Sequence, residues 1–204
     1  MMPLAGLLIA YLAGSIPFAY LAGKLFKGID LREHGSGNLG ATNVFRTMGW
    51  KIASVVMILD MAKGALPVLL LPPRFAPEYP VLWAIAFGVA AIVGHVKSIF
   101  LLWRGGGKGV ATSSGVFLAL APIPSLISLT VWGVVLYLSG YVSLASLTSA
   151  VVLTIAVVVM MGARSPVAIA CALVTAFVFW THRANIARLR RGEENHVRRA
   201  RPAT

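Results

Sequence analysis

The chain has 204 residues, of which 58% are hydrophobic and only 12% are charged, and its mean hydropathy is +0.85. A water-soluble domain of this composition would be left with an apolar exterior, so the composition excludes that class and indicates an integral membrane protein. The formal net charge of +12 could indicate nucleic-acid binding. The basic residues cluster between apolar segments and are not spread over one soluble face, which excludes nucleic acid as a partner.

The apolar segments predict an all-α, polytopic membrane protein with about seven transmembrane helices, some of them short. A helix rises about 1.5 Å per residue, so about 20 apolar residues cross the hydrocarbon core of a bilayer. Pro122 and Pro124 separate two of the segments, each of which is too short to cross comfortably. In chain order the predicted helices are 3–23, 52–71, 81–103, the short 110–121 and 125–138, then 142–161 and the somewhat short 166–181.

The basic residues predict the orientation of these helices. Five lie between Lys24 and Lys51, and seven arginines lie in the last 22 residues. Such clusters mark the cytoplasmic side, so an even number of crossings must separate them. Seven helices satisfy this condition, with the N-terminus outside and the C-terminus cytoplasmic. Five helices are the alternative, whereas merging the two short segments gives six and places the basic tail outside.

The first basic segment contains Gly35-Ser36-Gly37-Asn38-Leu39-Gly40-Ala41-Thr42-Asn43-Val44-Phe45-Arg46. Glycines allow backbone N–H groups to turn inward, and the guanidinium of Arg46 suits phosphate or carboxylate oxygens. We therefore predict an anion-binding loop. The same glycine spacing occurs in dinucleotide-binding folds, but there it follows a β-strand, and here an apolar segment of about 21 residues precedes it.

A second glycine-rich segment, 104–109, follows the third predicted helix and should return to the same side of the membrane. Its lysine, Lys108, is followed by Gly109 and lacks the neighbouring hydroxyl with which a phosphate-loop NTPase holds magnesium. The topology thus predicts that Arg46 and Lys108 lie at one membrane face.

A third polar cluster begins the C-terminal segment. The spacing of three residues places His182, Asn185 and Arg188 roughly on one face of a helix that leaves the membrane. Each of them could serve only as an interfacial anchor. Because three separate polar segments reach one membrane face, we favour a site for an anionic ligand over lipid anchoring alone.

Two charged residues lie within the second predicted helix. Asp60 and Lys63 are three residues apart and therefore share a helical face. Charges at this depth usually face protein or water and pair with each other. We interpret them as an internal ion pair that fixes packing, with a direct role in substrate binding as the alternative.

Three segments resemble a known family: GSGNLGATNVFR (35–46), GHVKSIFLLWRGGGKGVAT (94–112) and HRANIARLRRGEE (182–194). In order and spacing they are similar to the three motifs of the bacterial acyl-phosphate-dependent glycerol-3-phosphate acyltransferases, the PlsY family. The segment before Lys108 has three glycines where that family is expected to have two, and Lys97 stands where an aromatic residue is usual. The resemblance covers essentially the whole chain and implies one membrane-embedded domain, 1–204, with a flexible basic tail, 195–204.

The resemblance implies transfer of a fatty acyl group from acyl phosphate to the 1-hydroxyl of glycerol 3-phosphate, in a bacterial inner membrane and with the site facing the cytoplasm. We assign phosphate binding to Arg46 and Lys108. His182 is the candidate side-chain base, and a phosphate oxygen of the substrate is the alternative. Ser36 would be the nucleophile only if a covalent acyl-enzyme formed, which an acyl phosphate does not require. The expected substrate-binding residues are Gly35, Ser36, Gly37, Asn38, Thr42, Asn43, Arg46, His95, Gly107, Lys108, His182, Asn185 and Arg188.

Two other functions remain open at this point. A small transporter or flippase for a phosphorylated metabolite or lysolipid would also gather basic residues and glycines at one face. A non-catalytic protein that binds anionic lipids would explain the basic tail but not the two glycine loops. The expected partners are the two substrates and membrane lipids. We expect no cofactor and no metal, a monomer, and functional coupling to an enzyme that makes acyl phosphate.

Overall fold

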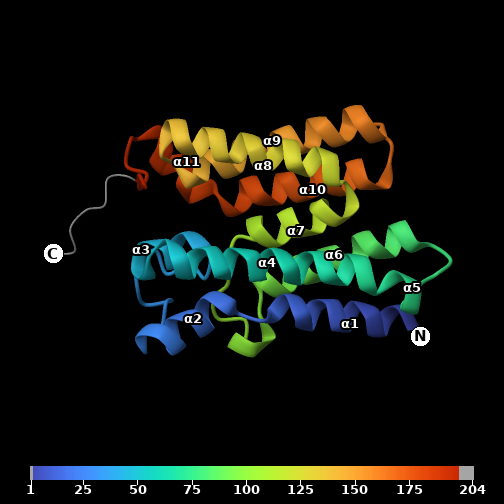
Figure 1. Ribbon diagram of the computed structural model, residues 1–204, viewed down its shortest axis with the longest axis horizontal. Helices are drawn as coiled ribbons and strands as arrows, with labels where there is room; N and C mark the ends of the chain where they lie inside the picture. Colours follow the sequence, from blue (N-terminus) through green and yellow to red (C-terminus); the bar gives the residue numbers. More distant parts are fainter. Residues whose placement is uncertain (1, 198–204) are drawn as a thin grey trace. The chain divides into compact units, whose positions relative to one another are not determined.

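The structure is a computed structural model that describes residues 2–197, and every regular element in that range is a helix. This confirms the predicted all-α class. The chain divides into two compact units, Met1–Leu120 and Ala121–Thr204. The single domain therefore stays a prediction, and residues 198–204 of the expected flexible tail lie outside the described range. The first unit comprises α1 (Met2–Ser15), α2 (Phe18–Lys27), α3 (Ala41–Met48), α4 (Trp50–Leu70), α5 (Pro72–Phe75), α6 (Pro80–Val96), the short 3₁₀ helix η1 (Ile99–Leu101) and α7 (Val110–Leu120) (Figure 1).

In the first unit, α1 packs against α6, while α4 packs against both α6 and α7. Glycines allow these helices to approach closely, as is common between helices in membranes. A Cβ atom on Gly115 would overlap the carbonyl oxygen of Met61 in α4, and one on Gly64 would overlap the carbonyl oxygen of Thr112 in α7. The crossing of α4 and α7 is therefore formed by backbone against backbone.

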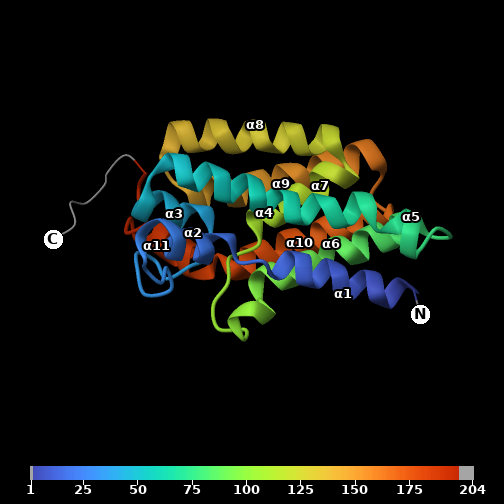
Figure 2. The same ribbon diagram turned by 60° about the horizontal axis from the view of Figure 1, so that its bottom comes forward.

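The first predicted helix, 3–23, is interrupted between Ser15 and Phe18. Pro17 has no N–H group for a helical hydrogen bond, which explains why the chain breaks there. The predicted end of the third helix at Trp103 is wrong, because α6 ends at Val96. The apolar residues that follow form the short η1 turn and a loop in which Leu102 and Trp103 have φ of 50° and 58°. Figure 2 shows this green loop between α6 and α7 extending beyond the neighbouring helices.

The second unit consists of α8 (Pro122–Ser139), α9 (Val142–Met161), α10 (Pro166–Thr181) and α11 (Arg183–Arg190). Pro122 and Pro166 occupy the first turns of their helices, where a missing N–H group removes no helical bond. The predicted helices 142–161 and 166–181 are confirmed residue for residue. After α11 the chain still contacts the rest of the second unit, because the N–H of Val197 donates to the carbonyl of Gly140, at 2.9 Å.

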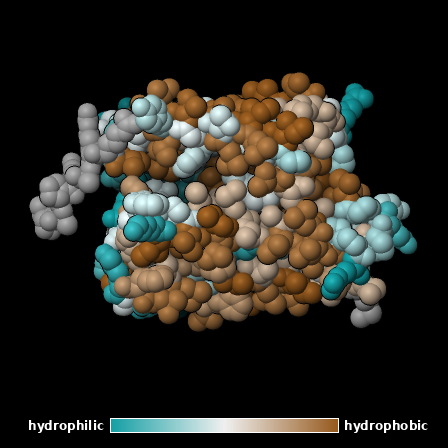
Figure 3. Space-filling view, in the orientation of Figure 1, coloured by the Kyte–Doolittle hydropathy of each residue, from teal (hydrophilic) through white to brown (hydrophobic). Residues whose placement is uncertain are grey.

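Five helical segments in the described residues are long and apolar enough to cross a membrane, and α10 with α11, bent by 59°, makes a sixth if it is one span. The 11-residue α7 is apolar but shorter. Large apolar side chains such as Ile58 and Val159 are exposed by 60% and 77%, and Figure 3 shows apolar residues over most of the visible helical surface. These features confirm a polytopic integral membrane protein. The count of seven crossings and the orientation of the termini stay predictions.

Candidate functional site

The first glycine loop is closed by the buried side chain of Asn43, in the first turn of α3. Its Oδ1 accepts a hydrogen bond from the N–H of Ser36, at 2.9 Å. Its Nδ2 donates to the carbonyls of Leu31, at 3.2 Å, and His34, at 3.0 Å. Gly35 has φ of +64°, and a Cβ atom there would overlap Asn43 Oδ1, so only glycine fits. Asn43 therefore holds the loop in a fixed shape.

The loop leads directly into the N-terminus of α3. The N-cap residue is Gly40, which has no side chain to cap the first N–H groups of the helix. A helix N-terminus carries partial positive charge and directs N–H groups outward, which makes it suitable for an anion. Thr42 lies in the first turn, and Arg46 is exposed in the last turn of the same helix. Both predicted residues thus belong to one short helix.

The second glycine loop is hydrogen-bonded to the first. The carbonyl oxygen of Gly106 accepts from the N–H of Leu39 and from Nδ2 of Asn38, each at 3.2 Å. Arg32 adds a third link, because its Nη1 donates to the carbonyl of Arg104, at 3.1 Å. These contacts confirm that the two loops meet.

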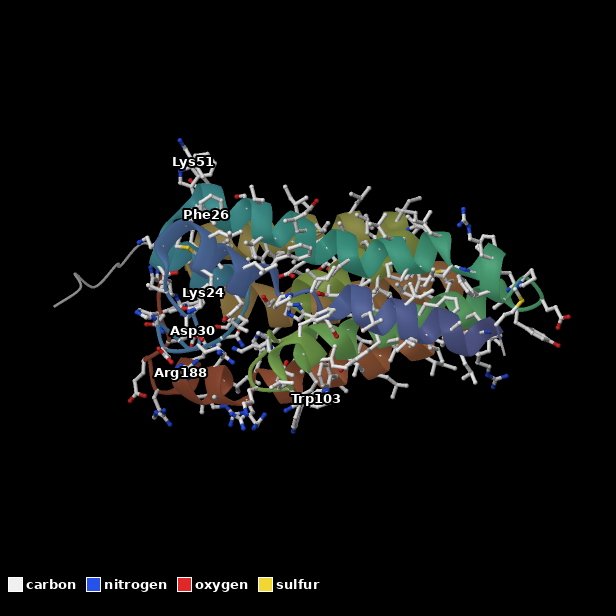
Figure 4. All side chains as sticks on the ribbon, turned by 90° about the horizontal axis from the view of Figure 1, so that it is seen from below. Lys24, Phe26, Asp30, Lys51, Trp103 and Arg188 are labelled. Carbon is white, nitrogen blue, oxygen red and sulfur yellow. The ribbon has the colours of Figure 1, made fainter. Side chains whose placement is uncertain are left out.

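Arg32 is itself fixed by an ion pair with Asp30, at 2.6 Å. Hydrogen bonds from Arg32 lower the pKa of the Asp30 carboxyl to about 2. The pair therefore stays charged at any physiological pH, and the link from Arg32 to the second loop persists. Figure 4 shows Asp30 within the segment that joins α2 to α3.

Lys108 is half-buried. It follows Gly107, which packs closely against His95, and it precedes the start of α7. Gly107 is buried against the ring of His95, and a Cβ atom on it would overlap Nε2 of that ring. Gly109 has φ of +82°, and α7 begins at Val110. Lys108 is therefore placed beside a second helix N-terminus, in a loop whose path is fixed by His95.

The second unit holds the third polar cluster around a buried carboxylate that the sequence interpretation did not assign. Glu194 Oε1 accepts from Asn185 Nδ2, at 2.7 Å, and from Ser143 Oγ, at 3.0 Å. Its Oε2 accepts from Arg188 Nε, also at 2.7 Å. Burial raises the pKa of Glu194, but the hydrogen bonds from Asn185, Arg188 and Ser143 outweigh burial and lower it below its ordinary value. Glu194 thus connects α11 to the start of α9.

His182 is buried at the junction of α10 and α11, where the helices bend. Its Nδ1 lies 2.8 Å from the carbonyl oxygen of Val178. A carbonyl can only accept, so Nδ1 carries the proton, and in a neutral ring Nε2 is then the basic nitrogen. This geometry fixes which nitrogen could accept a proton from a substrate.

Glu194→Gln is expected to destabilise the protein by about 1.5–3 kcal/mol, because Arg188 would lose its charged acceptor. The pKa of Glu194 is lower in the folded state than its ordinary value of 4.5, so its contribution is complete above that pH and decreases as the pH falls through the folded value. Thermal unfolding of the detergent-solubilised protein at several pH values measures this. Glu193→Gln is the matched control, because the Glu193–Arg191 pair is exposed and contributes little. Equal melting temperatures for both variants would contradict the role of Glu194 as the buried acceptor that connects α11 to α9.

The structure divides the predicted residues between the two units. The first unit joins the two glycine loops and holds Arg46, His95 and Lys108. The second unit holds His182, Asn185 and Arg188. How the two groups act on one substrate stays a prediction. The sequence interpretation missed Asp30, Arg32 and Glu194. Glu194 had one usable signal, since it is an acidic residue in a segment otherwise rich in arginine.

The apolar helices, the joined glycine loops, the N-termini of α3 and α7 and the basic side chains of Arg46 and Lys108 define an integral membrane protein with features of an anion-binding site. The family model for glycerol-3-phosphate acyltransferase matches residues 4–192. The chain belongs to this family.

Individual relatives agree along nearly the whole chain. Glycerol-3-phosphate acyltransferase 2 of Bacillus cereus is 48% identical over 182 residues, which cover 89% of this chain and 88% of the relative. The glycerol-3-phosphate acyltransferase of Geobacillus kaustophilus is 45% identical, with 94% of each chain covered. The crystal structure of PlsY, an integral membrane glycerol 3-phosphate acyltransferase, in its glycerol 3-phosphate form has a TM-score of 0.87 at 37% identity and covers 96% of each chain.

Proposed function

We propose that this protein transfers a fatty acyl group from acyl phosphate to the 1-hydroxyl of sn-glycerol 3-phosphate. The products are lysophosphatidic acid and inorganic phosphate, in the first acylation of phospholipid synthesis. Membership of the glycerol-3-phosphate acyltransferase family supports the acceptor and the reaction class. The observation that carries the proposal is the pair of hydrogen bonds to the Gly106 carbonyl, which hold the two glycine loops together.

Both substrates carry phosphate, so the reaction needs positive charge more than it needs an activated nucleophile. The side chains of Arg46 and Lys108 and the N-termini of α3 and α7 supply that charge. The hydroxyl oxygen attacks the acyl carbonyl carbon, and the bond from that carbon to the phosphate oxygen breaks. The protein therefore acts by aligning the substrates and by stabilising the departing phosphate and the oxyanion.

The proton of the attacking hydroxyl has two candidate acceptors. One is Nε2 of His182, whose orientation follows from the contact of Nδ1 with Val178. The other is a phosphate oxygen of the substrate. A His182→Ala variant that keeps most of its turnover would leave the phosphate oxygen as the base. Ser36 remains the nucleophile of a covalent route, which trapping of a labelled acyl chain on its hydroxyl would establish.

The remaining parts of the proposal concern the surroundings of the enzyme. The protein lies in the bacterial inner membrane, with the glycine loops facing the cytoplasm, acts as a monomer and receives its donor from an enzyme that makes acyl phosphate. The cluster of basic residues in 24–51 supports the cytoplasmic placement of the loops.

The test is phosphate release by purified protein in detergent or lipid with palmitoyl phosphate and glycerol 3-phosphate, without metal and without acyl-CoA. Release that requires both substrates and yields lysophosphatidic acid is the expected result. A folded protein that binds glycerol 3-phosphate, releases no phosphate and moves the ligand across liposomes would instead be a transporter. Acylation that occurs only with acyl-CoA would keep the reaction class and overturn the proposed donor.

A further inference from the structure

Three ionisable side chains are buried together in the first unit, and one of them contacts the second glycine loop. Asp60 and Lys63 of α4 are 1% and 5% exposed, and His95 of α6 is 7% exposed. Lys63 Nζ lies 2.7 Å from Asp60 Oδ1, which confirms the ion pair inferred from the sequence. His95 Nδ1 lies 3.6 Å from the same oxygen. The Asp60 carboxylate therefore faces both a lysine on its own helix and a histidine on the next.

The lysine end of this cluster is fixed at the interruption between α1 and α2. Lys63 Nζ donates to the carbonyl of Ile16, at 2.7 Å, next to Pro17. A second bond closes the same region, since Ser98 Oγ, two residues after the end of α6, donates to the Ser15 carbonyl at 2.5 Å. The Lys63 ammonium is thus hydrogen-bonded to the backbone just before α2, and α2 leads to the first glycine loop.

The histidine end of the cluster touches the second glycine loop. A Cβ atom on Gly107 would overlap Nε2 of His95, so this ring defines how close the loop can come. The N–H of Gly107 also donates to the carbonyl of His95, at 3.3 Å. Lys108 is the next residue. A displacement of the His95 ring would therefore be transmitted directly to the position of the lysine.

A buried ion pair is weak as a stabilising device, because removing two charges from solvent offsets much of their attraction. An apolar pair would pack this part of α4 at least as well. The charges become understandable if Asp60 is required to hold the His95 ring in one orientation, in the same way that a carboxylate orients a histidine in many functional sites. Lys63 then holds the Asp60 carboxylate in place.

We propose that Asp60 and Lys63 are positioning residues of the acyltransferase, acting through His95 and Gly107 to hold Lys108 at the phosphate of glycerol 3-phosphate. This inference rests on the proposed function and adds two residues outside the three glycine- and arginine-containing segments. Neither residue touches the substrate. Both set the geometry of a loop that does.

The test compares Asp60→Asn, Lys63→Met and the double variant Asp60→Asn/Lys63→Met in the phosphate-release assay and in thermal unfolding. Each single variant leaves one charge buried alone and should be markedly less stable. The double variant removes both charges and should regain most of the melting temperature. We expect it still to lose about 10- to 100-fold in kcat/KM, mainly through a raised KM for glycerol 3-phosphate, because the loop is no longer held.

A purely structural role would predict the opposite result for the double variant, namely recovery of both stability and the wild-type KM, and that result would overturn the inference. Asp60→Glu provides a second arm if the charge-removing variants do not fold. It keeps the pair with Lys63 but moves the carboxylate relative to His95, so a raised KM in a folded protein supports the positioning role and an unchanged KM rejects it.

Thr154→Val is the control for loss of a partly buried polar contact between helices, because Thr154 Oγ1 lies 2.9 Å from Thr175 Oγ1 in the second unit, between α9 and α10. It should lower stability without raising the KM for glycerol 3-phosphate. Wild-type protein is assayed alongside every variant. An inactive wild type would overturn the proposed function, whereas an active wild type with unchanged variants would overturn only the positioning role.

Discussion

Lys108→Ala is expected to lower kcat/KM by about 100- to 1,000-fold while the protein remains folded. Lys108 is half-buried and lies two residues before the start of α7, and we propose that its side chain and this helix N-terminus bind the same phosphate. Under the proposed function, its removal takes away a cation that binds the phosphate of glycerol 3-phosphate. Arg46→Ala should have a loss of similar size, because the planar guanidinium binds phosphate oxygens in pairs. The phosphate-release assay on purified variants measures both.

Lys51→Ala controls for the general loss of a positive charge near these loops. Lys51 lies in the first turn of α4, with Nζ 5.9 Å from the centre of the Trp50 ring, and in Figure 4 it extends away from the helices. Its removal should leave kcat/KM unchanged. If Lys108→Ala and Lys51→Ala behaved alike, Lys108 would be only one basic surface residue among others and the proposed phosphate contact would be wrong.

Gly115→Ala is expected to destabilise the protein by about 1–3 kcal/mol and to lower activity together with stability. The added Cβ atom would overlap the carbonyl oxygen of Met61, and a backbone atom within α4 cannot rotate away as a side chain can. The two helices must therefore move apart. Because α7 begins two residues after Lys108, this movement also displaces the lysine. Thermal unfolding and the KM for glycerol 3-phosphate are the measurements.

Gly133→Ala supplies the matched control for this substitution. Gly133 lies within α8, and apart from the backbone of α8 itself no atom of the described residues would come within 4 Å of an added Cβ atom. Alanine also favours a helix over glycine by about 0.5–1 kcal/mol, so this variant should be neutral or slightly more stable. A Gly115→Ala protein that melts with the wild type would show that the α4–α7 crossing tolerates a wider separation.

The sequence predicted most of the helices because apolar length and proline position are local properties. Helices α9 and α10 have the expected bounds. The turn 162–165, from Gly162 to Ser165, ends α9, and Pro166 begins α10. The end of α6 was wrong for an equally physical reason. Residues 99–103 are as apolar as a membrane helix, and composition alone does not separate a helix from an apolar turn. The bend at Pro17 was also missed.

The candidate site was predictable at the level of loops and not at the level of atoms. Charge distribution along the chain was enough to place the two glycine loops at one face, and the Gly106 carbonyl joins them there. The inward-facing role of Asn43 was not foreseeable, because an asparagine in a glycine loop can equally well face a ligand. Glu194 was missed because one of its three partners, Ser143, comes from α9, and no local pattern links that helix to the segment after α11.

The hydrogen bond from Asn38 to the Gly106 carbonyl joins residues 68 positions apart in the chain. Contacts of such long range form late in folding, since the helices between them must first be in place. A partly folded chain therefore has two separate glycine loops and no completed phosphate-binding region in this unit. Glycerol 3-phosphate that binds only the assembled loops will favour the fully folded molecule by mass action. The substrate pool of the cell thus also acts on the folding equilibrium of the enzyme that consumes it.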